Sequence, residues 1–147
     1  MALKDNVAEF TAAIQHWAKT VAPEKVLLFQ RAIALEMLRR VVIKTPVDTG
    51  RARGNWQVTI GEPAAGHLEN LFDKTGSTTI AKGSAVIAKI PPFAIVYITN
   101  NVPYILILEA GRVPGPPARG SKQAEHGMAG ITFQEALAVF APKTKGV

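Results

Sequence analysis

Apolar residues recur every three or four positions at the start of the chain, which is the spacing of one face of a helix. Between residues 5 and 21 this stripe consists of Val7, Phe10, Ile14, Trp17 and Val21. A stripe this regular needs cover from a partner helix, in the same chain or in a neighbouring subunit. Of the two, packing into the protein's own core is the preferred interpretation.

A second helix is predicted from Pro23, a residue that suits a first helical turn, to Lys44. Its main apolar face holds Val26, Ile33, Met37, Leu38 and Val41. Four further apolar residues lie off that face: Leu27, Phe29, Leu35 and Val42. We therefore expect this helix to be covered on more than one side.

From residue 51 the pattern becomes typical of strands. In an extended chain, Arg51, Arg53 and Asn55 fall on one face, and Ala52, Gly54 and Trp56 fall on the other, which should meet the core. The following "WQVTI" is predicted to be a strand. "FAIVYIT" (93–99) is rich in β-branched and aromatic residues and is predicted to be a well-buried strand. Residues 77–90 fit a helix or a strand, and the helix is favoured although Gly83 weakens it.

Two segments without periodicity, 61–76 and 112–127, are rich in glycine, proline and polar residues and are predicted to be exposed loops. The second is expected to be disordered or to become ordered only on a partner. A short helix should end at Gly111. A last helix is expected over about 128–140, before a basic tail. Its apolar positions are Ile131, Leu137 and Phe140.

Together these elements predict a single α+β domain that spans residues 1–147. Two long N-terminal helices and a C-terminal helix should pack on a small sheet, expected to be antiparallel, that includes residues 54–60 and 93–99. Hydrophobic residues make up 48% of the chain, which is enough to bury a core at this length.

The chain carries 17 Lys and Arg residues against 11 Asp and Glu, which gives a formal net charge of +6. Such a charge attracts anionic partners in general. The basic residues are scattered, however, and no surface of interleaved aromatic and basic residues is evident. Specific nucleic-acid recognition is therefore the less favoured interpretation.

The chain has no cysteine, so it forms no disulfide and offers no thiolate nucleophile. The N-terminal "MALKDNVAEF" lacks the apolar core of a signal peptide. Apolar runs stop far short of the roughly 20 residues of a membrane span. We therefore expect no membrane partner, and synthesis and folding in the cytoplasm.

The stretch "TPVDTGRARGNW" (45–56) contains Asp48-Thr49-Gly50, the triplet in which aspartic proteases place a catalytic carboxylate. Here the triplet follows a long helix closed by Pro46 rather than a strand, and Arg51 adds a cation beside it. A single triplet would also require a homodimer. The favoured interpretation is a turn, in which Asp48 and Thr49 bond to local backbone N–H groups and Gly50 adopts a positive φ.

Other signs of catalytic chemistry are weak. His16, His67 and His126 are isolated and lack the spacing of metal ligands. No serine has the context of a nucleophile elbow, and no phosphate-binding loop is present. The sequence therefore predicts no catalytic residue, no metal site and no cofactor.

Two separated stretches nevertheless fit one family. "TPVDTGRARGNWQ", and "YITNNVPYILILEAG" followed by "SKQAEHGM", resemble the signatures of the tail-completion, or neck, proteins of long-tailed bacteriophages. Ala110 stands where that family usually has an aromatic residue, and "RVPGPPARG" looks like an insertion. The matching positions are Thr45, Pro46, Asp48, Thr49, Gly50, Arg51, Gly54, Trp56, Asn100, Pro103, Tyr104, Glu109, Gly111, Ser121, Lys122 and Gln123.

The resemblance implies a non-enzymatic virion protein that caps the assembled tail and joins it to the DNA-filled head, usually as a ring of six copies. The implied partners are other copies of the chain, a tail tube or tail terminator protein, a head-side connector protein and DNA in the channel. Arg51 and Arg53 are expected to pair with carboxylates of a neighbouring subunit or to line the channel. The candidate interface residues are Arg51, Arg53, Trp56, Tyr104, Glu109, Arg112, Arg119, Lys122 and Gln123.

Two other functions stay open at the level of sequence. A small basic nucleic-acid-binding protein would bind free DNA with a steep salt dependence. A homodimeric aspartic protease, the less favoured of the two, would lose all activity on Asp48→Asn.

Overall fold

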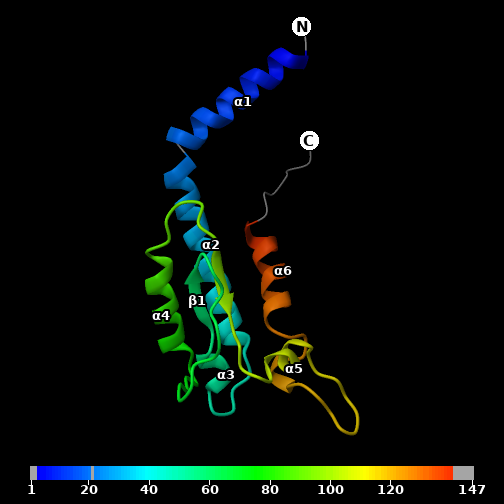
Figure 1. Ribbon diagram of the computed structural model, residues 1–147. Helices are drawn as coiled ribbons and strands as arrows, with labels where there is room; N and C mark the ends of the chain where they lie inside the picture. The colour runs from blue at the N-terminus through cyan, green and yellow to red at the C-terminus, as the bar shows by residue number, and fades with distance from the viewer. Residues whose placement is uncertain (1–2, 21, 141–147) are drawn as a thin grey trace.

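The computed structural model describes residues 3–20 and 22–140 and has an α+β fold (Figure 1). The first two helices form where the apolar pattern predicts them, as α1 (Leu3–Thr20) and α2 (Ala22–Lys44). Helix α1 contacts α2 but leads away from the rest of the fold, so the prediction that both N-terminal helices pack on the sheet holds for α2 and not for α1 (Figure 1). Val21, the last residue of the predicted stripe, and the basic tail after Pro142 lie outside the described residues.

Helix α2 is the centre of the fold, and α4 (Ser77–Ile87) and α6 (Ala129–Phe140) both pack on it. Its C-terminal half supplies the largest share of the core, and it is covered on more than one side, as predicted. The core cluster consists of Ala34, Leu38, Val41, Val42, Trp56, Val58, Ile87, Ile90, Ala124 and Met128. Glu135 of α6 adds two ion pairs across the same contact, with Arg40 Nη1 and with Lys44 Nζ, each at 2.7 Å.

The sheet has two antiparallel strands, β1 (Gln57–Ile60) and β2 (Val96–Thr99), with Val58 opposite Ile98. The antiparallel pairing confirms the prediction. β2 begins later than predicted, because Phe93 adopts a positive φ of 64° after two prolines and belongs to a turn. Its four residues are half-buried rather than well buried.

Residues 77–87 form a helix, which decides the open choice between helix and strand. Gly83, which weakened the helical prediction, is needed for packing. A Cβ at this position would lie 2.3 Å from Leu38 Cδ2 and 2.9 Å from Val58 Cγ2. The missing side chain therefore allows α4 to lie directly on α2 and β1.

The prediction of an extended segment at 51–56 is wrong, because residues Arg51–Gly54 form a short helix, α3. Gly50 turns the chain with a φ of 90°, and the Gly54 N–H donates to the Gly50 carbonyl at 2.9 Å. Residues 51–54 therefore form one helical turn and do not alternate between two faces as they would in a strand. Trp56 still reaches the core, as expected, and is 8% exposed.

The predicted loop at 61–76 contains no helix or strand, but it is not exposed throughout. Asp73 and Gly76 are buried against the rest of the fold. The short helix before Gly111 is α5 (Ile105–Glu109), and Gly111 has a φ of 81°.

The segment 112–127 is more ordered than predicted. Val113 and Arg119 pair as an isolated antiparallel bridge, which makes residues 113–119 a hairpin. The Arg112 N–H then donates to the Glu125 carbonyl at 2.9 Å. A 3₁₀ turn at Lys122–Ala124 brings Ala124 into the core. Because these backbone groups bond to one another, the segment becomes ordered without a partner.

Helix α6 occupies the predicted range, but the prediction of its apolar face is only partly correct. Thr132 and Ala136 are the buried residues of this helix. Leu137 is 52% exposed and Phe133 is 55% exposed. Thus the small side chains of Thr132 and Ala136 lie against α2, while Phe133 and Leu137 are largely exposed; Phe140 packs edge-to-face on Phe29 of α2, with ring centroids 5.7 Å apart.

Candidate functional site

The segment after α2 is fixed by buried hydrogen bonds rather than by apolar packing alone. Thr45 is fully buried, and its hydroxyl donates to the Val41 carbonyl at 2.7 Å. The indole Nε1 of Trp56 donates to the same hydroxyl oxygen at 2.7 Å. Trp56 is therefore part of the core, which removes it from the candidate interface residues.

Arg53 closes the C-terminal end of α2. Its guanidinium donates to the carbonyls of Ile43 at 2.9 Å, Thr45 at 2.9 Å and Lys74 at 2.7 Å. A cation at this end of a helix is favourable because the last carbonyls lack partners within the helix. Burial lowers the pKa of Arg53, and the negative charge of Asp73 opposes that effect. The guanidinium of Arg53, which was predicted to pair with a neighbouring subunit or to line a channel, thus bonds to carbonyls of its own chain.

Asp73 performs the corresponding role at the start of α4. The carboxylate accepts hydrogen bonds from the Gly76 N–H at 2.9 Å, the Thr79 N–H at 2.8 Å and the Thr79 hydroxyl at 2.7 Å. Burial alone raises the pKa of Asp73, but the bonds from Thr79, Gly76 and Thr75 outweigh it and the pKa lies below its ordinary value. Asp73 was not among the predicted site residues, although an aspartate within a few residues of a helix start is a common source of such bonds, and Asp73 lies three residues before the N-cap Gly76.

Gly50 connects these two helix ends. A Cβ there would lie 2.7 Å from backbone atoms of Asp73 and Lys74, so only glycine fits. The Gly50 carbonyl also accepts the Asp73 N–H at 3.0 Å. The positive φ predicted for Gly50 is confirmed, and its cause is this close approach of two loops.

Asp48 and Thr49 precede this contact and are both exposed. Thr49 accepts a hydrogen bond from the Arg51 N–H at 3.3 Å, as the turn interpretation predicted. The Asp48 carboxylate makes no hydrogen bond or ion pair within residues 3–20 and 22–140, so its predicted bond to local backbone is not formed.

Glu109 links α5 to α6. Its carboxylate accepts the N–H groups of Met128 at 3.0 Å, Ala129 at 2.9 Å and Gly130 at 2.9 Å. These are orphan donors at the start of α6, where a negative charge is favourable. Glu109 was predicted as an interface residue, and the structure places its carboxylate on the protein's own backbone.

The two stretches that resemble phage neck proteins, the one around residues 45–57 and the one after residue 97, are held together by the amide side chains of Gln123 and Asn100. Gln123 donates to the Val47 carbonyl at 3.1 Å and accepts the Val47 N–H at 2.9 Å. Asn100 donates to the Ala52 carbonyl at 2.8 Å. Residues about 50 to 75 positions apart in the sequence thus lie side by side.

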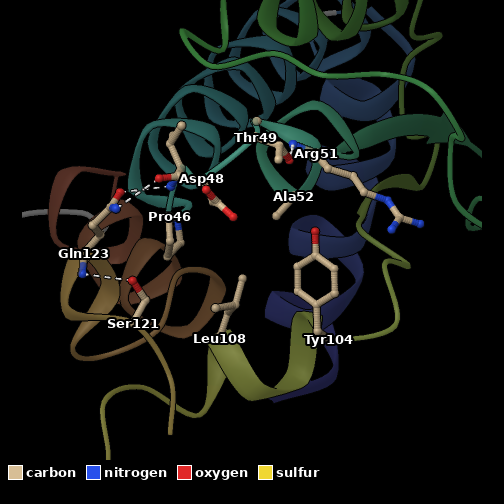
Figure 2. Close-up of a pocket in the computed structure, with 11 residues that line it drawn as sticks. Pro46, Asp48, Thr49, Arg51, Ala52, Tyr104, Leu108, Ser121 and Gln123 are labelled. Atoms are coloured by element: carbon tan, nitrogen blue, oxygen red, sulfur yellow. Dashed lines mark hydrogen bonds between the residues drawn. The ribbon is translucent and has the colours of Figure 1, made fainter. Parts of the chain in front are cut away.

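A cleft of about 240 Å³ lies where the two motifs meet (Figure 2). Tyr104 and Leu108 rise from α5 toward the 46–52 segment, while Arg51 points away from Leu108. The lining residues are Pro46, Val47, Asp48, Thr49, Gly50, Arg51, Ala52, Tyr104, Leu108, Ser121 and Gln123. Arg51, Tyr104 and Gln123 are the predicted interface residues that this cleft brings together.

A shallower hollow continues the cleft past Arg51 and Tyr104. It adds Glu69, Asn70 and the exposed ring of Phe72. The combined surface carries one guanidinium, two carboxylates and two aromatic rings on a concave face. This composition resembles a protein-binding surface more than a dry small-molecule pocket.

The remaining predicted residues lie elsewhere. Arg112 is half-buried at the base of the 113–119 hairpin, and Arg119 and Lys122 are exposed beyond it. None of the three lines the cleft. In the part of the chain that the structure describes, no group of three or more His, Asp or Glu residues could hold a metal ion. No described helix combines the length and apolarity needed to cross a membrane.

Comparisons with protein families, with curated proteins and with solved structures find no match for this chain.

Proposed function

We propose that this protein is a structural component of a long-tailed bacteriophage particle. As a ring-forming subunit it completes the tail and joins it to the DNA-filled head, so that it resides in the virion neck. The single observation that supports this proposal is the convergence of the two motifs of resemblance. They are separated in the sequence, yet Gln123 and Asn100 hold the second against the first around one cleft.

In this proposal the cleft receives a segment of a neighbouring subunit or of a tail protein. The guanidinium of Arg51 bonds to no residue within 3–20 and 22–140, and Tyr104 offers an aromatic face. Arginine and tyrosine are enriched among the residues that contribute most to protein interfaces. The 113–119 hairpin, with Val113 50% exposed, provides a second projecting contact for a head or tail protein.

The first test is electron microscopy of lysates from a phage or induced prophage in which this gene carries an early stop codon. We expect filled heads and separate tails, and joined particles after addition of the purified protein. Normal infectious particles from the stop-codon phage would contradict the proposal. Steep salt dependence of binding to free DNA would then favour the nucleic-acid alternative.

A point variant tests the cleft itself. Arg51→Ala should reduce the yield of joined particles at least tenfold, while Arg51→Lys should restore part of it. Lys82→Ala is the matched control, because Lys82 is an exposed cation on α4 that does not line the cleft. Arg53 is left intact, since its loss would disturb α2 rather than a contact. Equal joining by Arg51→Ala and Lys82→Ala would remove the cleft from the proposal.

A further inference from the structure

An apolar trough runs along the side of the fold between α6 and the sheet. Its floor is Ile33 and Met37 of α2, one wall is Phe133 and Leu137 of α6, and the other wall is Val96 and Ile98 of β2. Two adjoining hollows of about 400 and 330 Å³ share that floor. Their linings are almost entirely apolar, with Gln30 as the single polar residue.

The trough lies over a part of the sheet face that the chain's own helices cover incompletely. Helix α4 covers the sheet on the β1 side, where Gly83 lies against Val58. Val96 and Ile98 lie on the same sheet face as Val58, because Ile98 is paired with Val58 and Val96 with Ile60. These two β2 residues are only half-buried, and among the described elements no helix packs on β2 as extensively as α4 packs on β1.

The same chain contains a helix that needs cover. By sequence spacing, the apolar stripe of α1 holds Val7, Phe10, Ile14 and Trp17. Val7 is 56% exposed, and α1 leads away from the fold (Figure 1). An apolar stripe on a helix that projects from the fold is costly in water and favours a docking partner.

We infer that α1 of one copy docks in the apolar trough of a second copy. The dimensions are comparable: the stripe from Val7 to Trp17 rises about 15 Å, and the part of α6 that lines the trough, from Phe133 to Phe140, rises about 10 Å. The two aromatic residues of the stripe can each bury roughly 150–250 Å². With the aliphatic residues they approach the roughly 800 Å² per partner of a specific interface.

The chain's own α1 does not reach its own trough. It leads away from the sheet and α6, which flank the trough, and its contacts with the fold are made chiefly with α2 (Figure 1). A second copy can supply the same helix to the trough.

A helix that fits a different surface on the next copy makes a heterologous contact, which closes into a ring when the rotation permits. The inference thus deepens the proposed function by naming a ring contact, and it rests on that function only for the expectation of a closed ring. The contact between copies follows from the trough and the stripe alone.

The absence of cysteine from the sequence makes disulfide trapping clean. Ile14→Cys and Leu137→Cys are prepared as separate full-length proteins, mixed in equal amounts and oxidised. We expect mixed dimers at least ten times more abundant than from Ala12→Cys mixed with Leu137→Cys. Ala12 is exposed and lies on the opposite side of α1 from the stripe, so it is the matched control.

Each single-cysteine chain cannot form an internal disulfide, so a mixed dimer requires contact between copies. No enrichment over the Ala12 control would overturn the inference. A chain that carries both cysteines and closes only an internal disulfide would also overturn it, in favour of α1 folded onto its own trough. A purified protein that stays monomeric would point to a different protein as occupant, with the same consequence.

A charge placed in the trough gives an independent readout. Leu137→Glu should weaken self-association at least tenfold by light scattering, with an unchanged circular dichroism spectrum because Leu137 is half exposed. Leu28→Glu is the control, since Leu28 is 63% exposed on α2 and does not line the trough. Equal association of the two variants would overturn the inference.

The two proposals fail separately. Mixed dimers together with normal particles from the stop-codon phage would retain the docking and overturn the proposed function. Separate heads and tails without mixed dimers would retain the function and overturn the docking.

Discussion

The region around Arg53, Asp73, Glu109 and Gln123, here called the capped region, differs sharply from the apolar trough. In the capped region charged and amide side chains end on backbone groups of the same chain, so that the ends of α2, α4 and α6 are satisfied internally. In the trough, apolar side chains of α2, β2 and α6 stay partly in water. The polar groups of one region are satisfied within a single chain, whereas the other region leaves apolar side chains partly exposed.

The largest effect is expected at Asp73. Asp73→Ala removes four hydrogen bonds and leaves buried donors of Gly76 and Thr79 without a partner. We expect a loss of about 2–4 kcal/mol in the free energy of unfolding, measured by urea denaturation. Asp48→Ala is the control, since Asp48 is exposed, and it should change stability by less than about 0.5 kcal/mol. Similar losses in both variants would show that the buried hydrogen bonds of Asp73 do not stabilise the fold more than an exposed carboxylate does.

Acid should act on the same group. Because the pKa of Asp73 is lower in the folded protein than its ordinary value, ionised Asp73 stabilises the fold above that ordinary value. This contribution is lost as the pH falls through the folded pKa, which places the window below about pH 4. We expect the stability difference between wild type and Asp73→Asn to shrink from pH 6 to pH 3. A difference that stays constant would show that Asp73 does not carry this dependence.

A smaller effect separates two neighbouring arginines. Arg53→Ala removes the guanidinium that holds three carbonyls at the end of α2 and should cost about 1–2 kcal/mol of unfolding free energy. Arg51→Ala should change stability by less than about 0.5 kcal/mol, because its guanidinium bonds to no described residue. Thermal unfolding followed by circular dichroism measures both. If Arg51→Ala proved as destabilising as Arg53→Ala, Arg51 would stabilise its own chain, as the residues of the capped region do, rather than wait for a partner.

The smallest effect is expected in the trough. Phe133 is 55% exposed, so Phe133→Ser should leave the stability of the isolated chain within about 0.5 kcal/mol of wild type. The measurement is urea denaturation at a protein concentration where the chain is monomeric. A loss of more than about 2 kcal/mol would mean that Phe133 is buried within its own chain. Such a loss would contradict an open trough.

The pattern of apolar residues was sufficient for most of the secondary structure. The apolar stripes of period 3.6 over α1 and α2 and the β-branched run before Asn100 depend only on local spacing. The helices and the antiparallel strand β2 formed at these places. The short helix at 51–54 was missed because four residues are too few for periodicity to distinguish a turn of helix from a strand. The outward position of Leu137 was missed because the choice of face on α6 is made by its fit to α2.

The candidate site was anticipated in part. The resemblance singled out Arg51, Tyr104 and Gln123, which do gather at one cleft. It also singled out Arg53, Trp56 and Glu109, whose polar atoms are bonded within their own chain. Motif residues that cap helices and motif residues that line a surface look alike in a sequence, since both are polar and closely spaced.

Residue types and spacing were enough to predict most of the helices, the antiparallel strand pair and the absence of thiol chemistry, because each depends on residue type and on neighbours within a few positions. Which polar side chains bond within the chain, the contact of Gly50 with Asp73, and the half-burial of β2 became defined with the tertiary structure. Those properties depend on contacts between residues far apart in the chain. Hydrogen bonds and close packing are short-ranged, so they are defined only once the elements are in place.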